Sequence, residues 1–172
     1  MDGKSSCKCC SIVDELGRAR AVFPMGAHWT VNARIRHERP GLVVQSRLHR
    51  ESMADLDAAE REDLGRVLAV ATRYMESLPG VEKVYVSLWN EGFPSHVHFH
   101  LIPRCTSDLG APLGPGLADI HPSEFRADTR DVAMRVSQLA SLERVERSRT
   151  VLLALATCQS WSRVSLYRFA SR

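Results

Sequence analysis

Apolar and polar residues alternate with a period of two in several short stretches of the chain, and this pattern predicts β-strands. The stretches lie at 21–23, 29–35, 42–44 and 81–89. The dipeptide Pro40-Gly41 is a strong turn signal between the second and third of them. The first half of the chain is therefore expected to build a sheet.

A single amphipathic helix is predicted between the third and fourth of these strands. Asp57 and Glu60 have the spacing of a capping box, in which each side chain satisfies the backbone of the other residue. Apolar residues then recur at three- and four-residue steps as one stripe, formed by Leu64, Val67, Leu68, Ala71, Tyr74, Met75 and Leu78. Pro79-Gly80 ends the helix. Such a stripe indicates packing, so we expect the helix to cover one face of the sheet.

The chain changes character after Arg104. Residues 108–116 are rich in glycine and proline and predict a linker. A helical period over 129–145 predicts a C-terminal helix that packs on the domain or across a dimer. Disorder of the last dozen residues is the alternative there. We expect one domain at 1–106, followed at 107–172 by a linker and a helical extension that is partly disordered in that alternative.

Composition narrows the class of protein. The chain has 172 residues, of which 44% are hydrophobic and 25% charged, as in a globular protein with one core. The net charge is only +3 and the basic residues are scattered, which argues against a nucleic-acid surface. No apolar run is long enough to span a membrane, and the N-terminus lacks the apolar segment of a secretion signal. We expect a cytoplasmic protein with reduced thiols, in which clustered cysteines favour metal over disulfides.

Three histidines alternate with apolar residues in the stretch 95–104. In a strand, His96, His98 and His100 share one face, with neighbouring rings about 6.5–7 Å apart. That spacing suits a face that surrounds one phosphate or metal ion. One catalytic zinc bound by all three is disfavoured, because the three positions span about 13 Å while zinc–ligand bonds are about 2 Å long. An exposed face of solvated histidines remains as the structural alternative.

Cysteines open the chain. Cys7 and Cys10 form a Cys-x-x-Cys pair with Cys9 between them. Alone, such a pair is half a zinc site, a redox pair or a chance occurrence. The strand–helix context of a thioredoxin-like redox motif is missing around it.

The pattern His-φ-His-φ-His-φ-φ, with φ apolar, resembles the histidine-triad (HIT) family over about 7–104 of the chain. The resemblance implies an α+β fold, with an antiparallel sheet backed by the helix and two copies paired into a homodimer. It also implies a nucleotide hydrolase or nucleotidyl transferase that attacks an α-phosphate through a nucleotidyl-histidine intermediate on His98. His100 then binds a phosphate oxygen, and His96 completes the triad. The alternatives are a non-catalytic nucleotide-binding domain, a zinc-stabilised interaction domain and another metal hydrolase.

The same resemblance implies the remaining contacts. Val31 and Asn32 hold the base and ribose, and Asn90 contacts the phosphate or ribose side. The loop before the histidines is shorter than in many members of the family, and its Ser95 either offers a hydroxyl to the nucleotide or is a plain turn residue. A structural zinc is bound by Cys7, Cys10, His49 and His96, with a metal-free flexible terminus as the alternative. No catalytic metal is required, because a neutral imidazole with one nitrogen protonated against a backbone carbonyl is itself a nucleophile near neutral pH.

Overall fold

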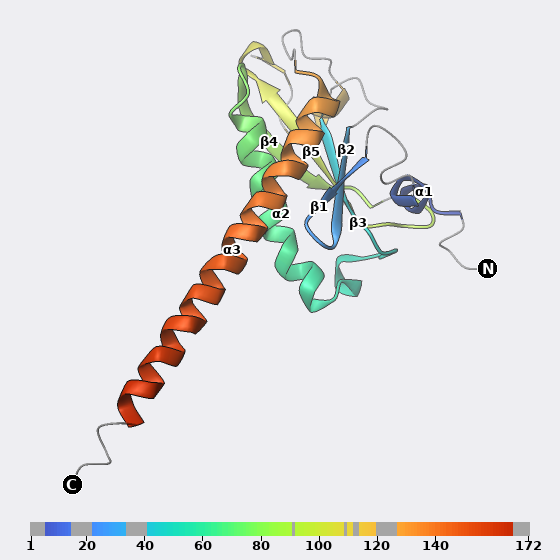
Figure 1. Ribbon diagram of the computed structural model, residues 1–172. Coiled ribbons are helices and arrows are strands. Elements are labelled where there is room, and N and C mark those ends of the chain that lie inside the picture. The colour runs from blue at the N-terminus through green and yellow to red at the C-terminus, as the bar shows by residue number, and fades with distance from the viewer. Residues whose placement is uncertain are drawn as a thin grey trace. The chain divides into compact units, whose positions relative to one another are not determined.

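The computed structural model of the protein describes residues 6–14, 22–33, 41–90, 92–108, 110–111, 114–119 and 127–166. Within them, five strands form one antiparallel sheet in the order β1-β2-β3-β5-β4 (Figure 1). The strands are β1 Val22–Met25, β2 Trp29–Ala33, β3 Leu42–Ser46, β4 Val81–Leu88 and β5 His98–Cys105. The α-helices are α1 Lys8–Asp14, α2 Ala58–Glu76 and α3 Thr129–Leu166. Short 3-10 turns lie at η2 Met53–Asp55, η3 Thr106–Asp108 and η4 Gly114–Asp119.

The predicted strands are present with small changes at their ends. β1 continues to Met25 and β3 to Ser46, while β2 ends at Ala33. Residues 21, 34–35 and 40 of the predicted strands and turn lie outside the described residues. The predicted linker at 108–116 overlaps the end of η3 and the start of η4, and residues 109 and 112–113 lie outside the described residues. The α+β fold with an antiparallel sheet is confirmed.

The turn between β1 and β2 requires glycine. Gly26 has a φ of +70°, a conformation that other residues rarely adopt. A Cβ at this position would lie 2.4 Å from Oδ2 of Asp63 in α2. The same carboxylate accepts a hydrogen bond from the backbone of Ala27. The turn is therefore held directly against the helix.

The start of α2 is defined by the predicted capping box. The backbone N–H of Glu60 donates to Asp57 Oδ1, and that of Asp57 donates to Glu60 Oε2, both at 2.8 Å. Glu60 is fully buried, and Nε of Arg50 donates to its two carboxylate oxygens at 3.1 and 2.9 Å. The helix N-terminus thus holds the segment that follows His49.

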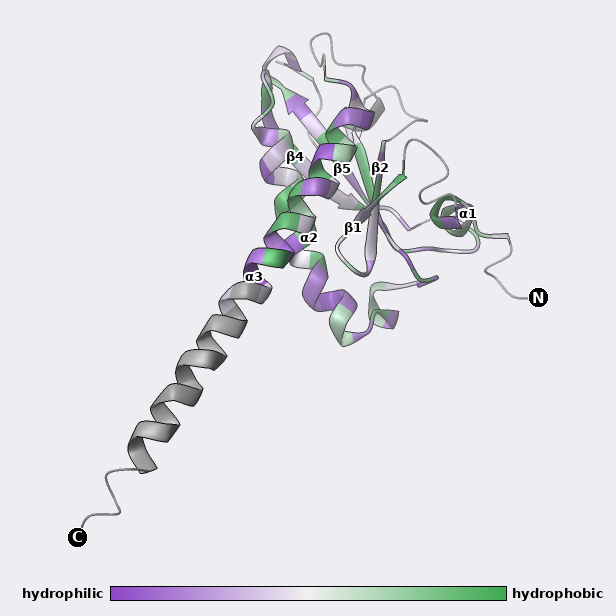
Figure 2. Ribbon diagram, in the orientation of Figure 1, coloured by the Kyte–Doolittle hydropathy of each residue, from purple (hydrophilic) through white to green (hydrophobic). Residues whose placement is uncertain are grey.

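The core lies between one face of the sheet and the helices α2 and α3 (Figure 1). Alternate strand residues point into it, as the period of two requires: Trp29, Val31, Leu42, Val44, Phe99 and Leu101. Hydrophobic residues of α2 and of the first turns of α3 gather where the helices meet (Figure 2). The other face of the sheet is left for His98, His100 and their neighbours.

The predicted C-terminal helix begins at Thr129. Val132, Val136 and Ala140 are buried in the core, and the hydroxyl of Ser137 donates to the carbonyl of Pro24 in β1. The chain divides into two compact units, Met1–Ala140 and Ser141–Arg172. In the second unit the helix continues to Leu166. Among the described residues, no helix combines the length and apolar character needed to cross a membrane.

Candidate functional site

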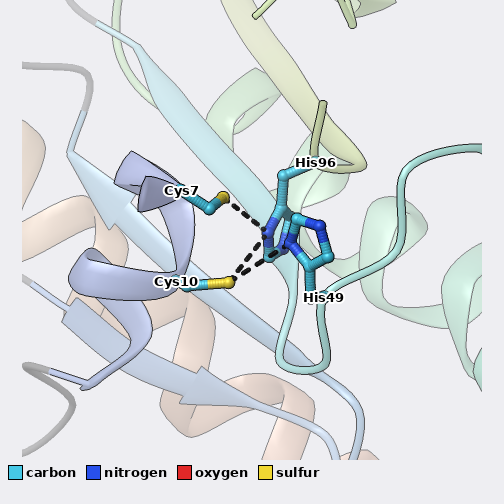
Figure 3. A group of neighbouring side chains, drawn as sticks. All are labelled: Cys7, Cys10, His49 and His96. Carbon is cyan, nitrogen blue, oxygen red and sulfur yellow. Dashed lines mark hydrogen bonds between the residues drawn. The ribbon is translucent and has the colours of Figure 1, made fainter. Parts of the chain in front are cut away.

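Four side chains from distant parts of the sequence converge beside α1 (Figure 3). Cys7 and Cys10 flank the first turn of α1, His49 follows β3, and His96 precedes β5. One ligand atom from each lies within 4.8 Å of the others. Both thiols and His96 are buried. The structure therefore brings the four predicted zinc ligands together.

Three of the six distances between ligand atoms in this group are close to the edges of a zinc tetrahedron. The His96 Nδ1 atom lies 3.4 Å from the Cys7 sulfur and 3.6 Å from the Cys10 sulfur, and the His49 Nδ1 atom lies 3.4 Å from the Cys10 sulfur. Zinc–sulfur bonds of about 2.3 Å and zinc–nitrogen bonds of about 2.0 Å at the tetrahedral angle place ligand atoms about 3.5 Å apart. Two thiols and two imidazoles are an ordinary zinc donor set, so the residues present fit this ion.

The ring of His96 is fixed with a lone pair facing the thiols. Its Nε2 atom lies 2.9 Å from the carbonyl oxygen of Ser46 and 3.0 Å from the hydroxyl of the same residue. Because a carbonyl only accepts, Nε2 carries the proton and Nδ1 is unprotonated in the neutral ring. Burial lowers the pKa of His96 below its ordinary value, against the opposing effect of the hydrogen bond to Ser46, and nearby His49 and His98 lower it further. Its neutral form, which is the one that binds metals, is therefore favoured.

Cys9 lies between the two ligands but does not belong to the group. Burial raises the pKa of its thiol to about 11, and the neighbouring Cys7 adds to the effect. The thiolate is the form that binds metals, so this thiol competes poorly. Its backbone carbonyl accepts a hydrogen bond from the buried Gln45 side chain, which attaches α1 to the sheet.

The histidine stretch does not form one continuous strand. β5 begins at His98, and His96 lies just before it. Just before β5, Val97 forms backbone hydrogen bonds with Ser46, at the end of β3, and with Arg50. Val97 is buried in the core with Phe99 and Leu101, so the alternation expected for the three histidines continues through this residue.

His98 and His100 form a close pair. Nδ1 of His98 lies 2.6 Å from the carbonyl oxygen of His96, so this nitrogen carries the proton and Nε2 is left with the lone pair of the neutral ring. The rings of His98 and His100 have centroids 5.0 Å apart at 69°. His98 is half-buried and His100 is buried. The backbone carbonyl expected to fix the tautomer of His98 is thus provided by His96.

Strand register identifies the other residues on the histidine face. Asn32 pairs with Val43, which pairs with His100, and Gln45 pairs with His98. The amide of Asn32 donates to Gln45 at 3.5 Å. Val31 lies on the opposite face, fully buried in the core. Of the two residues predicted to hold base and ribose, only Asn32 shares a face with the histidines.

The loop before the histidines uses its polar side chains internally. The Asn90 side chain accepts a hydrogen bond from the His96 N–H and donates to the Glu51 carbonyl. The Ser95 hydroxyl lies 3.1 Å from the carbonyls of Asn90 and of Gly92. Both side chains predicted to contact the nucleotide thus hold the loop in place.

Comparison with solved structures identifies the fold. No protein-family model matches the sequence, and no curated protein matches it. A Zn-bound histidine triad family protein from Mycobacterium smegmatis superposes with a TM-score of 0.55 at 20% identity, over 81% of this chain and 99% of that protein. The chain has the histidine-triad fold. A hypothetical protein from Leishmania major has a TM-score of 0.52 at 21% identity, over 89% of this chain and 98% of its own length.

Within the histidine-triad fold, three residues of the site were missed by sequence reasoning. Ser46 orients His96, Gln45 connects α1 to Asn32, and the Trp89 ring stacks on His100 with centroids 4.8 Å apart. Polar Gln45 and Ser46 at the end of an otherwise apolar strand were the available signal. Their partners are 13 to 50 residues away in the sequence, so the contacts themselves could not be read from it.

Proposed function

We propose that the protein is a nucleotide hydrolase or nucleotidyl transferase in which His98 attacks the α-phosphorus of a nucleotide conjugate. The observation that carries this proposal is the 2.6 Å contact between His98 Nδ1 and the His96 carbonyl. It leaves the Nε2 lone pair of a half-buried imidazole available as a nucleophile at neutral pH. The histidine-triad fold supports the substrate class.

The reaction proceeds in two displacements. His98 Nε2 forms a bond to the α-phosphorus as the bond to the leaving group breaks, which gives a nucleotidyl-histidine and the free leaving group. The ring is cationic in this intermediate, and the proton stays on Nδ1, which keeps donating its hydrogen bond to the His96 carbonyl oxygen. Water, or another acceptor in a transferase, then attacks phosphorus, and Nε2 departs with its electron pair. Dividing one difficult displacement into two easier ones is the benefit of covalent catalysis.

The neighbouring residues supply position and charge. His100, whose ring is 5.0 Å from that of His98, donates to a phosphoryl oxygen where negative charge develops. Asn32 reaches the ribose side from the adjoining strands of the same face. The loop of Asn90 and Ser95 borders the phosphate and keeps the His96 backbone in place.

The experiment is a screen of nucleoside phosphoramidates and dinucleoside polyphosphates for release of a nucleoside monophosphate. Hydrolysis in ¹⁸O-labelled water follows the oxygen, and quenching in alkaline denaturant traps the nucleotidyl-histidine, whose phosphorus–nitrogen bond is acid-labile but stable in base. A labelled peptide that contains His98 is the expected result. Tight nucleotide binding with no release from any substrate would instead favour the non-catalytic nucleotide-binding domain.

We further propose that Cys7, Cys10, His49 and His96 bind one structural zinc ion. Their near-tetrahedral spacing and the protonated Nε2 of His96 support this assignment. The ion would fix α1 to the sheet and so contribute to folding rather than to bond breaking.

Metal analysis of protein purified without chelator tests this site. About one zinc per chain is expected, lost in Cys10→Ser and His49→Ala. Cys9→Ser is the matched control and retains the metal, because Cys9 stands outside the ligand group. Metal-free protein from an untreated preparation would reject the site.

We propose that two copies pair through β4 into a homodimer with one continuous sheet. β4 is an edge strand of the described sheet, and its Val86 and Leu88 are 41% and 38% exposed. Unpaired strand edges that carry apolar residues favour pairing. Sedimentation of Val86→Arg is expected to give a monomer, whereas Met134→Arg, at an equally exposed apolar residue of α3, leaves a dimer. A monomeric wild-type protein at micromolar concentration would contradict the proposal.

A further inference from the structure

His100 is held between two aromatic rings. The Trp89 ring lies against it with centroids 4.8 Å apart and planes 30° apart, so the two faces overlap. The His98 ring approaches at 69°, closer to edge-on. The His100 ring is therefore in contact with both the indole ring of Trp89 and the ring of the proposed nucleophile.

Strand register explains how Trp89 reaches this place. Ser87 of β4 stands directly opposite His100, and Trp89 follows two positions later on the same face. Serine is small, which leaves room for the indole on the diagonal, a contact that long side chains make across neighbouring strands. On its other side the indole packs on a second apolar cluster formed by Ile102 and Leu117.

We propose that Trp89 is a positioning residue for His100: the indole face holds the His100 ring beside His98 and stabilises its protonated form. A cation within about 6 Å of an indole face is attracted by the negative centre of the ring. This role rests on the function proposed above, in which the protonated His100 would donate a hydrogen bond to the phosphoryl oxygen of the substrate.

The charges around His100 agree with this role. Its cross-strand partners are Val43 and Ser87, neither of which titrates. Among the residues that the structure describes, His98 is a titratable ring against it, and protonation of His98 would repel a His100 cation. Since the indole favours the cation and His98 opposes it, removal of the indole is expected to move the protonation midpoint of His100 to lower pH.

The test is an NMR titration of the His100 ring in metal-loaded protein, assigned by the resonance that disappears in His100→Gln. In Trp89→Leu the midpoint falls by about half a pH unit, and in Trp89→Phe by less, because a phenyl face attracts cations more weakly. Tyr85→Leu is the matched control. Tyr85 packs on the same apolar cluster but stands opposite Ile102 rather than His100. The protonation midpoint of His100 in Tyr85→Leu is therefore expected to stay at the wild-type value.

Kinetics supply the second readout. In Trp89→Leu, kcat falls several-fold and the basic limb of its pH profile moves to lower pH, while KM changes less. An unchanged NMR midpoint in Trp89→Leu overturns the proposal, as does an equal shift in Tyr85→Leu, which would assign the effect to the cluster as a whole. If no substrate is turned over, the NMR arm still decides the role of Trp89, so the two failures are distinguishable.

Discussion

The carbonyl oxygen of His96 accepts a hydrogen bond from Nδ1 of His98, while the ring of His96 faces the thiols of Cys7 and Cys10. One residue therefore belongs to the metal site through its side chain and to the nucleophile through its backbone. Any shift of His96 moves the acceptor that sets the tautomer of His98.

Loss of the metal should consequently lower turnover as well as stability. We expect His49→Ala, which does not touch His98, to lower kcat by about tenfold, the lower end of the cost of losing a supporting contact. Chelated wild-type protein should show the same loss and recover with added zinc, whereas His49→Ala should not recover. Full kcat in zinc-free protein would show that the two sites are independent.

Replacement of the nucleophile separates chemistry from binding. His98→Ala should abolish turnover and the trapped intermediate, because no other group can form the bond to phosphorus. Nucleotide affinity, measured by calorimetry, should stay within about tenfold, or about 1.4 kcal/mol. His28→Ala, at a histidine of the β1–β2 turn, is the control and should keep full activity. Normal activity of a folded His98→Ala protein would reject the mechanism.

The buried ion pair between Arg50 and Glu60 at the start of α2 should contribute much to the stability of the fold. Arg50→Met leaves the fully buried Glu60 carboxylate without its cation, at a cost of about 3 kcal/mol in the free energy of unfolding. Urea denaturation measures this loss. The double variant with Glu60→Gln should lose less than the sum of the single variants, because no uncompensated charge remains. A cost near that of a surface pair, below about 1 kcal/mol, would contradict the expectation.

Asp57 gives the fold a pH dependence of known sign. Its hydrogen bond with the backbone of Glu60 lowers the pKa of the carboxyl from its ordinary value of 3.8. A lowered pKa means that the folded state favours the carboxylate. The stabilisation is therefore fully present above pH 3.8 and is lost as the pH falls through the lowered pKa of the folded state. Asp57→Asn should therefore be less stable than wild type at neutral pH, and the difference should shrink below pH about 4. Thermal unfolding of both proteins across this range checks the prediction, and a constant difference would contradict it.

Local sequence patterns predicted the structural features that depend only on residues close together in the sequence. The capping box of Asp57 and Glu60 and the period of the strands were sufficient for α2 and the sheet. The zinc ligands were assigned through a resemblance, because nothing in the spacing of Cys10 and His49 states that their side chains meet.

Other features depend on contacts that a sequence does not state. Val31 and Asn32 are adjacent, and only the register shows that Asn32 shares the histidine face. The contact between the His96 ring and the Cys10 thiol joins residues 86 positions apart in the sequence. The stacking of Trp89 on His100 likewise follows from the pairing of Ser87, which no local pattern reveals.

The first turns of α3 have a consequence for the order of events during synthesis. Every residue of the proposed metal and nucleotide sites has been synthesised once residue 104 is made, but Val132, Val136 and Ala140 still have to complete the core beneath them. At about 5–20 residues per second, this delay lasts several seconds. During that interval the apolar face of the sheet lacks one of its two covering helices, and the nascent chain depends on α2 alone to shield it.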